Sequence, residues 1–577
     1  MHVRLLSVLL VFGLILAFSV GCQSETTTTK PVVTTTTKPI TTTTADPRLT
    51  INRFGWTVPA ETLTITGYNS SGNFNMSEEQ KQGRANMDKI LLEEFNVIFN
   101  MITTDGNGTE YLNLLLASGE YPEVIYNTSY ENVLRLIDLG KTKELSAALE
   151  AYGQDIKKAI GDLYPLFLDA EKKLWYIPIG VGALMELPDW SAHVRWDEYK
   201  EIGSPKIATP DDYYNVIHQI LERFPKTPAG ESRYALSLFN RPADNVTGPM
   251  GGSLAGYWGI KSGWKVASDN SLTYWPFTEG GKAMTKWFNR FWTAGTMDPD
   301  AFANNFDEWK AKFSNERIVG AIGGWWITYS AGHEVWRLVD PNFHEDKRFV
   351  QVGFKAPEAE ASYVTGKNKY GGSNTVITDK AQDVGRVISF INFQATEPGL
   401  ALFNWGVPGK LPTYKDPNTK IRIWDIDESG AWAFDETSKE QLVSETFDHP
   451  ASGVLGFGNY VLFSHVNRWA DGVHCVWGNQ MWYELNPWKT LLIQNMNGTI
   501  YDYTPMVLRQ KSESVVLLET AIIDTWRQNW PLAVQAKNDA EFEQLWTAFQ
   551  NAIKAAGIDE YTRIVEENYK TNITELG

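Results

Sequence analysis

The chain has 577 residues, a formal net charge of −17 and only two cysteines, Cys22 and Cys475. Nucleic acid and anionic lipid both attract basic surfaces, so the negative balance disfavours binding to either one, and two cysteines exclude a disulfide framework. With 43% hydrophobic residues and 23 tryptophans, the chain can bury enough side chains for two or more domains.

The first 22 residues have the pattern of an export signal. Arg4 precedes an apolar run over residues 5–20, which is short for a membrane span and typical of a secretory signal. The "SVGC" that ends at Cys22 resembles a bacterial lipoprotein box, although Ser19 stands where that box usually has leucine. The resemblance implies a lipoprotein signal peptide over residues 1–22, with Cys22 carrying palmitate on the extracellular face of the cell membrane. A plain signal peptide and an uncleaved anchor are the alternatives.

Residues 23–47 repeat the letters "TTTTKP" and carry few large apolar side chains. Such a segment cannot bury enough surface to offset the entropy lost on ordering, so we predict a disordered tether. It would span about 80 Å when fully extended and about 25–30 Å as a random coil. Either length would hold a folded body away from a membrane surface.

Strands and helices are predicted to alternate where the folded part of the chain begins. The predicted helices carry apolar stripes such as Met87, Ile90, Leu91 and Phe95, while the strands are continuous apolar runs. The expected order is a strand at 63–68, a helix from Ser77, a strand at 97–102, a helix at 109–118 ended by Gly119, and a strand at 123–126. This β-α-β-α-β order predicts a parallel sheet with right-handed crossovers.

Ligands of open α/β sheets bind beyond the carboxyl ends of the strands. Asn69, Tyr126 and Asn127 fall at such ends and carry neutral hydrogen-bonding groups. We therefore name them as candidate ligand contacts, with ordinary loop chemistry as the alternative.

Several segments, taken in order, resemble bacterial extracellular solute-binding proteins of the family 1 type. No single motif is specific, but together they cover most of residues 60–570. They are "YLNLLLASGEYPEVIY" (111–126), "KKLWYIPIG" (172–180), "VRWDEYKEIGSPKIATPDDYYNVI" (194–217), "WFNRFWTAGTMDPDAF" (287–302), "GAIGGWW" (320–326), "SFINFQATEPGLALFNWGVPG" (389–409) and "EFEQLWTAFQNAIKAAGIDEYTRIVEENY" (541–569). The similarity is greatest to the large lipoprotein branch that serves oligosaccharide uptake by ABC transporters.

The resemblance implies an α/β fold of the type II periplasmic-binding-protein kind, with two lobes that are each a sheet flanked by helices. Lobe one would hold residues 60–182 and 308–370, and lobe two residues 183–307 and 371–577. The chain would cross between them near Gly180–Val181, Phe306 and Gly371–Gly372. Glycines at two of these places favour hinges, although simple turns would also explain them.

The family's activity, carried over to this chain, implies a binding protein rather than an enzyme. It would capture an oligosaccharide between the lobes and deliver it to the permease subunits of an ABC importer, as a monomer without a cofactor. A receptor that senses the ligand without transporting it would work by the same physics. A secreted glycoside hydrolase is a further alternative, because acidic residues are plentiful and such an enzyme needs two carboxylates across a cleft.

Sugar recognition favours aromatic rings that lie in glycine-rich or polar surroundings, because the rings stack on the CH faces of a sugar. In sugar-binding relatives a tryptophan of the segment matching "GGWW" stacks on sugar, which makes Trp325 and Trp326 the first candidates. The remaining candidates by the same criterion are Tyr257, Trp258, Asn404, Trp405, Arg468 and Trp469.

Metal and catalytic motifs are not found in the sequence. Some family members carry a calcium loop after the Thr-Pro-Asp-Asp helix, but "FPKTPAGESRYALSLF" (224–239) lacks the alternating oxygen ligands, so we expect no metal there. The sequence contains no G-x-S-x-G, no H-E-x-x-H and no Walker A motif.

Overall fold

The structure is a computed structural model, and it describes a large part of residues 50–575. The described residues are 50–52, 54–70, 78–104, 108–181, 183–184, 190–238, 254–324, 328–340, 342–344, 346–396, 398–399, 402–403, 462–463, 498–502, 504–508 and 511–575. The predicted signal peptide, Cys22 and the tether lie outside these ranges.

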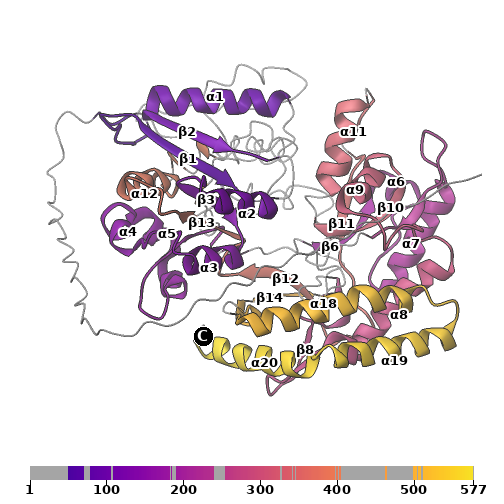
Figure 1. Ribbon diagram of the computed structural model, residues 1–577. Helices are drawn as coiled ribbons and strands as arrows, with labels where there is room; N and C mark the ends of the chain where they lie inside the picture. Colours follow the sequence, from indigo (N-terminus) through magenta and orange to yellow (C-terminus); the bar gives the residue numbers. More distant parts are fainter. Residues whose placement is uncertain are drawn as a thin grey trace, which may run out of the picture. The chain divides into compact units, whose positions relative to one another are not determined.

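The first sheet begins with three parallel strands. β1 (Leu63–Asn69) pairs in parallel with β2 (Val97–Ile102) on one side and with β3 (Val124–Thr128) on the other. Helices α1 (Glu78–Phe95) and α2 (Gly108–Ser118) connect these strands (Figure 1). The predicted β-α-β-α-β order and the parallel pairing are therefore confirmed, with small shifts at the strand ends.

The apolar positions that predicted these helices face the core. Met87, Leu91 and Phe95 of α1 are fully buried, and their spacing of four residues places them on one helix face. Leu112 of α2 is buried in the same cluster. Directly after α2, Gly119 adopts a φ of 76°, which glycine tolerates and which ends the helix.

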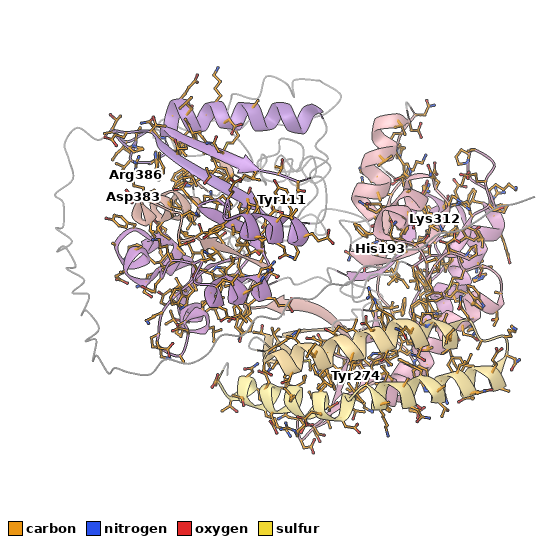
Figure 2. The ribbon with its side chains drawn as sticks, viewed as in Figure 1. Tyr111, His193, Tyr274, Lys312, Asp383 and Arg386 are labelled. Atoms are coloured by element: carbon orange, nitrogen blue, oxygen red, sulfur yellow. The ribbon has the colours of Figure 1, made fainter. Side chains whose placement is uncertain are left out.

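Two antiparallel strands complete this five-stranded sheet, whose order is β2-β1-β3-β13-β4. β13 (Ser373–Ile377) lies between β3 and β4 (Ile177–Ile179), so a distant part of the chain enters the sheet. The helices that share its hydrophobic cluster, called here the first core, include α3 (Tyr130–Asp138), α4 (Ser146–Tyr152), α5 (Gln154–Ile160) and α12 (Val384–Gln394). Asp383 caps α12 by accepting the Arg386 N–H at 3.0 Å, and both residues are labelled in Figure 2.

The second sheet has four strands in the order β11-β6-β10-β7. β6 (Trp190–Arg195) is antiparallel to both β10 (Ile318–Gly324) and β11 (Phe349–Val352), while β7 (Tyr234–Leu236) runs parallel to β10. Ala192 and Val194 of β6 belong to a second large hydrophobic cluster, the second core. Side chains alternate along a strand, so Ser191, His193 and Arg195 lie on the opposite face.

Helices from two distant parts of the chain pack in the second core. α7 (Pro210–Arg223) begins with a capping box in which Thr209 Oγ1 accepts the Asp212 N–H at 3.1 Å. The C-terminal helices join the same core, and Trp530 Nε1 donates to Thr285 Oγ1 of α8 at 3.0 Å. The remaining elements on this side are α6 (Trp196–Glu201), the β8 (Trp264–Val266) and β9 (Leu272–Tyr274) hairpin, α8 (Glu279–Thr293), α9 (Phe306–Ser314), α11 (Glu334–Val339), α18 (Glu513–Val534), α19 (Asp539–Ala555) and α20 (Ile558–Glu575).

A third sheet carries the chain between the two cores. Its order is β14-β12-β5, formed by β5 (Ala183–Leu184), β12 (Ser362–Asn368) and β14 (Gly498–Asp502). β5 follows β4 and precedes β6, and β12 follows β11 and precedes β13, so each strand links an element of one core to an element of the other. Hydrogen bonds within this sheet therefore join the connecting segments to one another.

The pairing of the strands corrects the predicted division into lobes. Residues 308–370, expected in lobe one, hold β10 and β11 of the second sheet, whereas β13 and α12, expected in lobe two, belong to the first core. Phe306 begins α9, which packs beside β10, so no crossing occurs there. The chain does pass between the cores near Gly180–Val181 and Gly371–Gly372, the other two predicted positions.

Within the described ranges, none of the helices combines the length and hydropathy needed to cross a lipid bilayer. The same ranges contain no group of three or more His, Cys, Asp or Glu side chains arranged to hold a metal ion. At the segment tested above for a calcium loop, Thr227 and Gly230 form a tight turn, and Arg233 donates to the Phe224 carbonyl at 3.1 Å and to the Glu316 carbonyl at 2.8 Å.

Candidate functional site

Polar groups gather where β1 and β3 end. The Ser70 N–H donates to the Tyr126 carbonyl at 2.9 Å, and the Ser70 hydroxyl donates to Thr128 Oγ1 at 3.1 Å. Asn127 adopts a φ of 51°, a left-handed conformation that Asn reaches more easily than most residues. Its Oδ1 accepts the Ser373 hydroxyl at 3.2 Å, which joins the end of β3 to the start of β13.

Helix α3 starts directly after this edge. Ser129 is its N-cap, and the Ser129 hydroxyl accepts the Asn132 N–H at 3.3 Å. Beside it, the Asn374 amide donates to the Thr128 carbonyl at 3.1 Å. A short polar surface of hydroxyls and amides is therefore fixed at the carboxyl edge of the first sheet.

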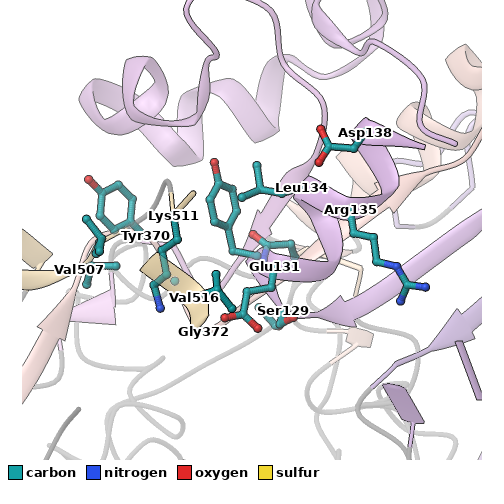
Figure 3. A pocket seen from close by; sticks show the side chains of 15 residues that line it. Ser129, Glu131, Leu134, Arg135, Asp138, Tyr370, Gly372, Val507, Lys511 and Val516 are labelled. Atoms are coloured by element: carbon teal, nitrogen blue, oxygen red, sulfur yellow. The ribbon is translucent and has the colours of Figure 1, made fainter. Parts of the chain in front are cut away.

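A pocket of about 550 Å³ opens next to this polar edge (Figure 3). It contains residues from α3, from the segment that crosses between the cores, and from the chain just before and within α18. Its lining is Ser129, Tyr130, Glu131, Leu134, Arg135, Asp138, Tyr370, Gly371, Gly372, Ser373, Asn374, Val507, Leu508, Lys511 and Val516. Because α3 belongs to the first core and α18 to the second, both cores contribute side chains to one pocket.

The lining combines apolar surface with neutral polar groups. Tyr130 and Tyr370 are half-buried aromatic residues, and Leu134 with three residues from 507–516 adds aliphatic surface. Of the charged side chains, Glu131, Arg135 and Asp138 are exposed on α3. Lys511 is different, because it is largely buried and forms an ion pair with Glu519.

The crossing segment beside the pocket is tightly packed. Gly371 adopts a φ of 80°, and a Cβ atom at this position would lie 2.4 Å from the Ile179 carbonyl oxygen. The next residue, Gly372, donates its N–H to that same oxygen at 3.0 Å. The Lys369 N–H donates to the Thr504 hydroxyl at 2.8 Å, so this crossing segment is also bonded to the chain that follows β14.

Among the predicted ligand contacts at the first sheet, only Asn127 lies beside the pocket with a side chain that is not buried. Asn69 is 2% exposed, and Tyr126 is fully buried with its ring 6.1 Å from that of Phe99. Side chains alternate along β3, so Tyr126 points into the core whereas the next residue, Asn127, does not. Asn69 and Tyr126 are thus buried in this structure, and a ligand contact for either residue stays a prediction.

Tyr257 and Trp258 are also core residues. The Tyr257 ring lies 4.4 Å from that of Phe354, its hydroxyl donates to the Val352 carbonyl at 3.1 Å, and burial raises its pKa. Trp258 packs edge-on against Trp287. The glycines around this pair serve packing, since a Cβ on Gly256 would lie 1.6 Å from the Tyr363 carbonyl oxygen.

The other predicted site residues lie outside the described ranges: Trp325, Trp326, Asn404, Trp405, Arg468 and Trp469. Trp325 and Trp326 directly follow β10 in the sequence. Sequence reasoning missed Ser129, Tyr370, Asn374 and Lys511. Signals in the sequence could have found three of them: Ser129 caps a helix that follows a strand end, and Tyr370 and Asn374 lie within two residues of the Gly371–Gly372 pair, which favours a hinge.

No family model matches the sequence, and no curated protein matches it either. Solved structures, in contrast, match it over nearly their whole length. The ABC-transporter substrate-binding protein FusA of S. pneumoniae, in complex with fructo-nystose, aligns with a TM-score of 0.62 at 14% identity over 89% of this chain and 100% of that one. The alginate-binding protein AlgQ2, solved without calcium ion, aligns with a TM-score of 0.59 at 15% identity over 89% and 99%. An HMO-binding, ABC-transporter-associated solute-binding protein from Bifidobacterium longum infantis aligns with a TM-score of 0.55 at 13% identity over 89% and 99%.

These matches establish the fold. The chain has the α/β architecture of two-lobed ABC-transporter solute-binding proteins, with several sheets flanked by helices. The proteins that it resembles are binding proteins rather than enzymes.

Proposed function

We propose that this protein captures a neutral oligosaccharide outside the cell and delivers it to an ABC importer. One observation supports the proposal most strongly: the fold is shared, over 99–100% of their length, with ABC-transporter binding proteins whose names specify fructo-oligosaccharide and HMO ligands. The pocket supports it independently, because its lining comes from both cores.

A ligand that touches both cores stabilises the arrangement in which it makes most contacts. Closure around a ligand is driven only by the difference in affinity between the two arrangements, so contacts on both sides are required. The pocket meets this requirement, because α3 lines one side and Val507, Leu508, Lys511 and Val516 line the other. The connecting strands between the cores supply the few residues that would change conformation.

The chemistry of the pocket suits a sugar. Tyrosine rings such as Tyr130 and Tyr370 offer faces for CH groups, while Ser129, Ser373 and Asn374 offer neutral donors and acceptors for hydroxyls. A volume of about 550 Å³ is within the usual range for small-molecule sites, which is about 300–1,000 Å³. We further propose that Trp325 and Trp326 stack on the ligand, and that Asn404, Trp405, Arg468 and Trp469 contribute to the same site.

The N-terminal sequence fits a protein that works beside a membrane transporter. We propose that Cys22 is lipidated and that residues 23–47 form the tether between the lipid and the folded body. Tethering raises the effective concentration of a binding protein at its transporter.

A thermal-shift screen tests the proposal. The panel contains kestose, maltotriose, cellotriose and xylotriose as neutral oligosaccharides, with glucose as a monosaccharide control. At 100 times its Kd, a ligand stabilises the folded state by about 2.7 kcal/mol, which corresponds to a rise of about 2–3 °C in Tm for a chain of this size. No rise with any oligosaccharide would contradict binding, and release of shorter sugars during incubation would favour a glycoside hydrolase instead.

A further inference from the structure

Among the charged residues that the structure describes in the pocket lining, Lys511 alone is largely buried. Its side chain is 15% exposed. Its Nζ lies 2.5 Å from Oε2 of Glu519, which is eight residues further along the chain, in α18. Lys511 lies among the lining residues labelled in Figure 3, close to Tyr370 and Val516. The ammonium group is therefore held at the pocket and not free in solvent.

The partner carboxylate is itself held by a third residue. Glu519 is 8% exposed, and its Oε1 accepts the Tyr561 hydroxyl of α20 at 3.1 Å. Burial, reinforced by the Glu519 charge, raises the pKa of Tyr561, so its hydroxyl keeps the proton that it donates. Both carboxylate oxygens are thus occupied, which fixes the position of the carboxylate and, through it, of the ammonium.

An ammonium group in such a pair remains a donor while its charge is compensated. Lys carries three N–H donors and no acceptor, and one of the three is directed at Glu519. The other donors are oriented by the same pair without the cost of ordering a long, exposed side chain. Arg135, the other cation of the lining, differs because it is exposed and donates to the neutral Asn113 Oδ1.

We propose that Lys511 donates a hydrogen bond to the ligand and selects an uncharged, hydroxylated molecule, with Glu519 and Tyr561 as positioning residues. This inference rests on the proposed function and names the recognition chemistry of its site. The Lys511–Glu519 pair has no net charge. Of the other charged residues that the structure places in the lining, Glu131 and Asp138 are carboxylates and Arg135 is a cation, so they would not favour an anionic sugar. A neutral sugar hydroxyl accepts from the ammonium without that opposition.

The test compares charge-neutral variants in the full chain. Lys511→Met alone would leave the Glu519 carboxylate buried without its cation, so the double variant Lys511→Met/Glu519→Gln is used. The matched control is Lys200→Met/Asp346→Asn, which removes the 2.5 Å ion pair between Lys200 of α6 and Asp346, both outside the pocket lining. Isothermal titration with the neutral trisaccharide that raises Tm most gives the Kd of each protein.

We expect binding to weaken about 10- to 100-fold in the pocket variant, the usual effect of losing a hydrogen bond to a charged group, and to stay within about twofold in the control. The wild-type Kd should change little between 50 and 500 mM NaCl, because the pair has no net charge. Equal binding by wild type and the pocket variant would overturn the role of Lys511 but not the proposed function. No binding of any neutral trisaccharide by wild type would overturn the proposed function, and this inference with it.

Glu519→Gln provides a readout that a purely structural role would not change. It leaves Lys511 as an uncompensated cation in the pocket. We expect this variant to bind the anionic trisaccharide trigalacturonate more tightly relative to the neutral one, with an affinity that falls as salt is added. An unchanged preference between the two sugars would show that Glu519 does not set the charge selectivity, and stronger binding of trigalacturonate by wild type would overturn the selection of an uncharged ligand.

Discussion

Replacing Gly371 by alanine should test whether the crossing beside the pocket is held as the structure describes. The residue has a φ of 80°, and an added Cβ would lie 2.4 Å from the Ile179 carbonyl oxygen. A left-handed conformation costs a non-glycine residue about 1–2 kcal/mol, and overpacking against a rigid neighbour adds about 1–3 kcal/mol. The neighbour here is backbone, and the Gly372 N–H already donates to the same oxygen at 3.0 Å, so little relaxation is available.

Gly119→Ala is the matched control for this substitution. Gly119 has a similar φ of 76°, but nothing lies within 4 Å of an added Cβ. Urea unfolding should therefore give about 1–2 kcal/mol of destabilisation for Gly119→Ala and about 2–5 kcal/mol for Gly371→Ala. Equal losses in the two variants would refute the close approach of the crossing segments at Ile179.

Three further predictions concern pH, the tryptophans and the anchor. Burial lowers the pKa of His193 to about 3, so the unfolded chain binds more protons below its own pKa of about 6.5, and stability falls as pH drops through that range. Between pH 8 and pH 5, His193 alone should lower the free energy of unfolding by about 2 kcal/mol. Urea unfolding at the two pH values checks this, because the loss in His193→Gln should be about 2 kcal/mol smaller than in the wild type. Trp325→Ala/Trp326→Ala should abolish the oligosaccharide-induced rise in Tm, and a retained rise would remove that pair from the site. As a comparison, Trp258→Ala should lower the Tm of the ligand-free protein, because replacing a core tryptophan costs about 3–5 kcal/mol of stability. Cys22→Ser should release the protein from the membrane fraction, as judged by fractionation and by mass spectrometry of the N-terminal peptide, and continued membrane association would contradict lipidation at Cys22.

Local patterns in the sequence were sufficient for the first part of the fold. The apolar spacing of Met87, Leu91 and Phe95 and the continuous apolar runs around them predicted strands and helices that the structure confirms. The resemblance marked Thr-Pro-Asp-Asp as a helix start, and α7 does begin there, with a capping box between Thr209 and Asp212. These features depend on neighbours within one or two helical turns, which is why they can be read from the sequence.

The candidate site was less accessible from the sequence. An aromatic residue between glycines looks the same whether its ring stacks on a sugar or packs in a core, and Tyr257 and Trp258 proved to be core residues because η2 (Ala255–Trp258) lies directly against Tyr363 of β12. Lys511 gave no sequence signal, because its partner Glu519 lies eight residues further along the chain and is itself held by Tyr561 of a different helix.

The sequence by itself determined the β-α-β-α-β order of the first sheet and the passages between the cores near Gly180–Val181 and Gly371–Gly372. Only the tertiary structure decided which strands share a sheet: β10 pairs with β6, and β13 enters between β3 and β4. The physical reason is that the alternation of apolar residues along a strand indicates which face is buried, whereas it does not indicate which other strand will hydrogen-bond to either edge. Partners far apart in the chain are chosen by the packing of whole cores, and the pocket lined from both of them exists only once that choice is made.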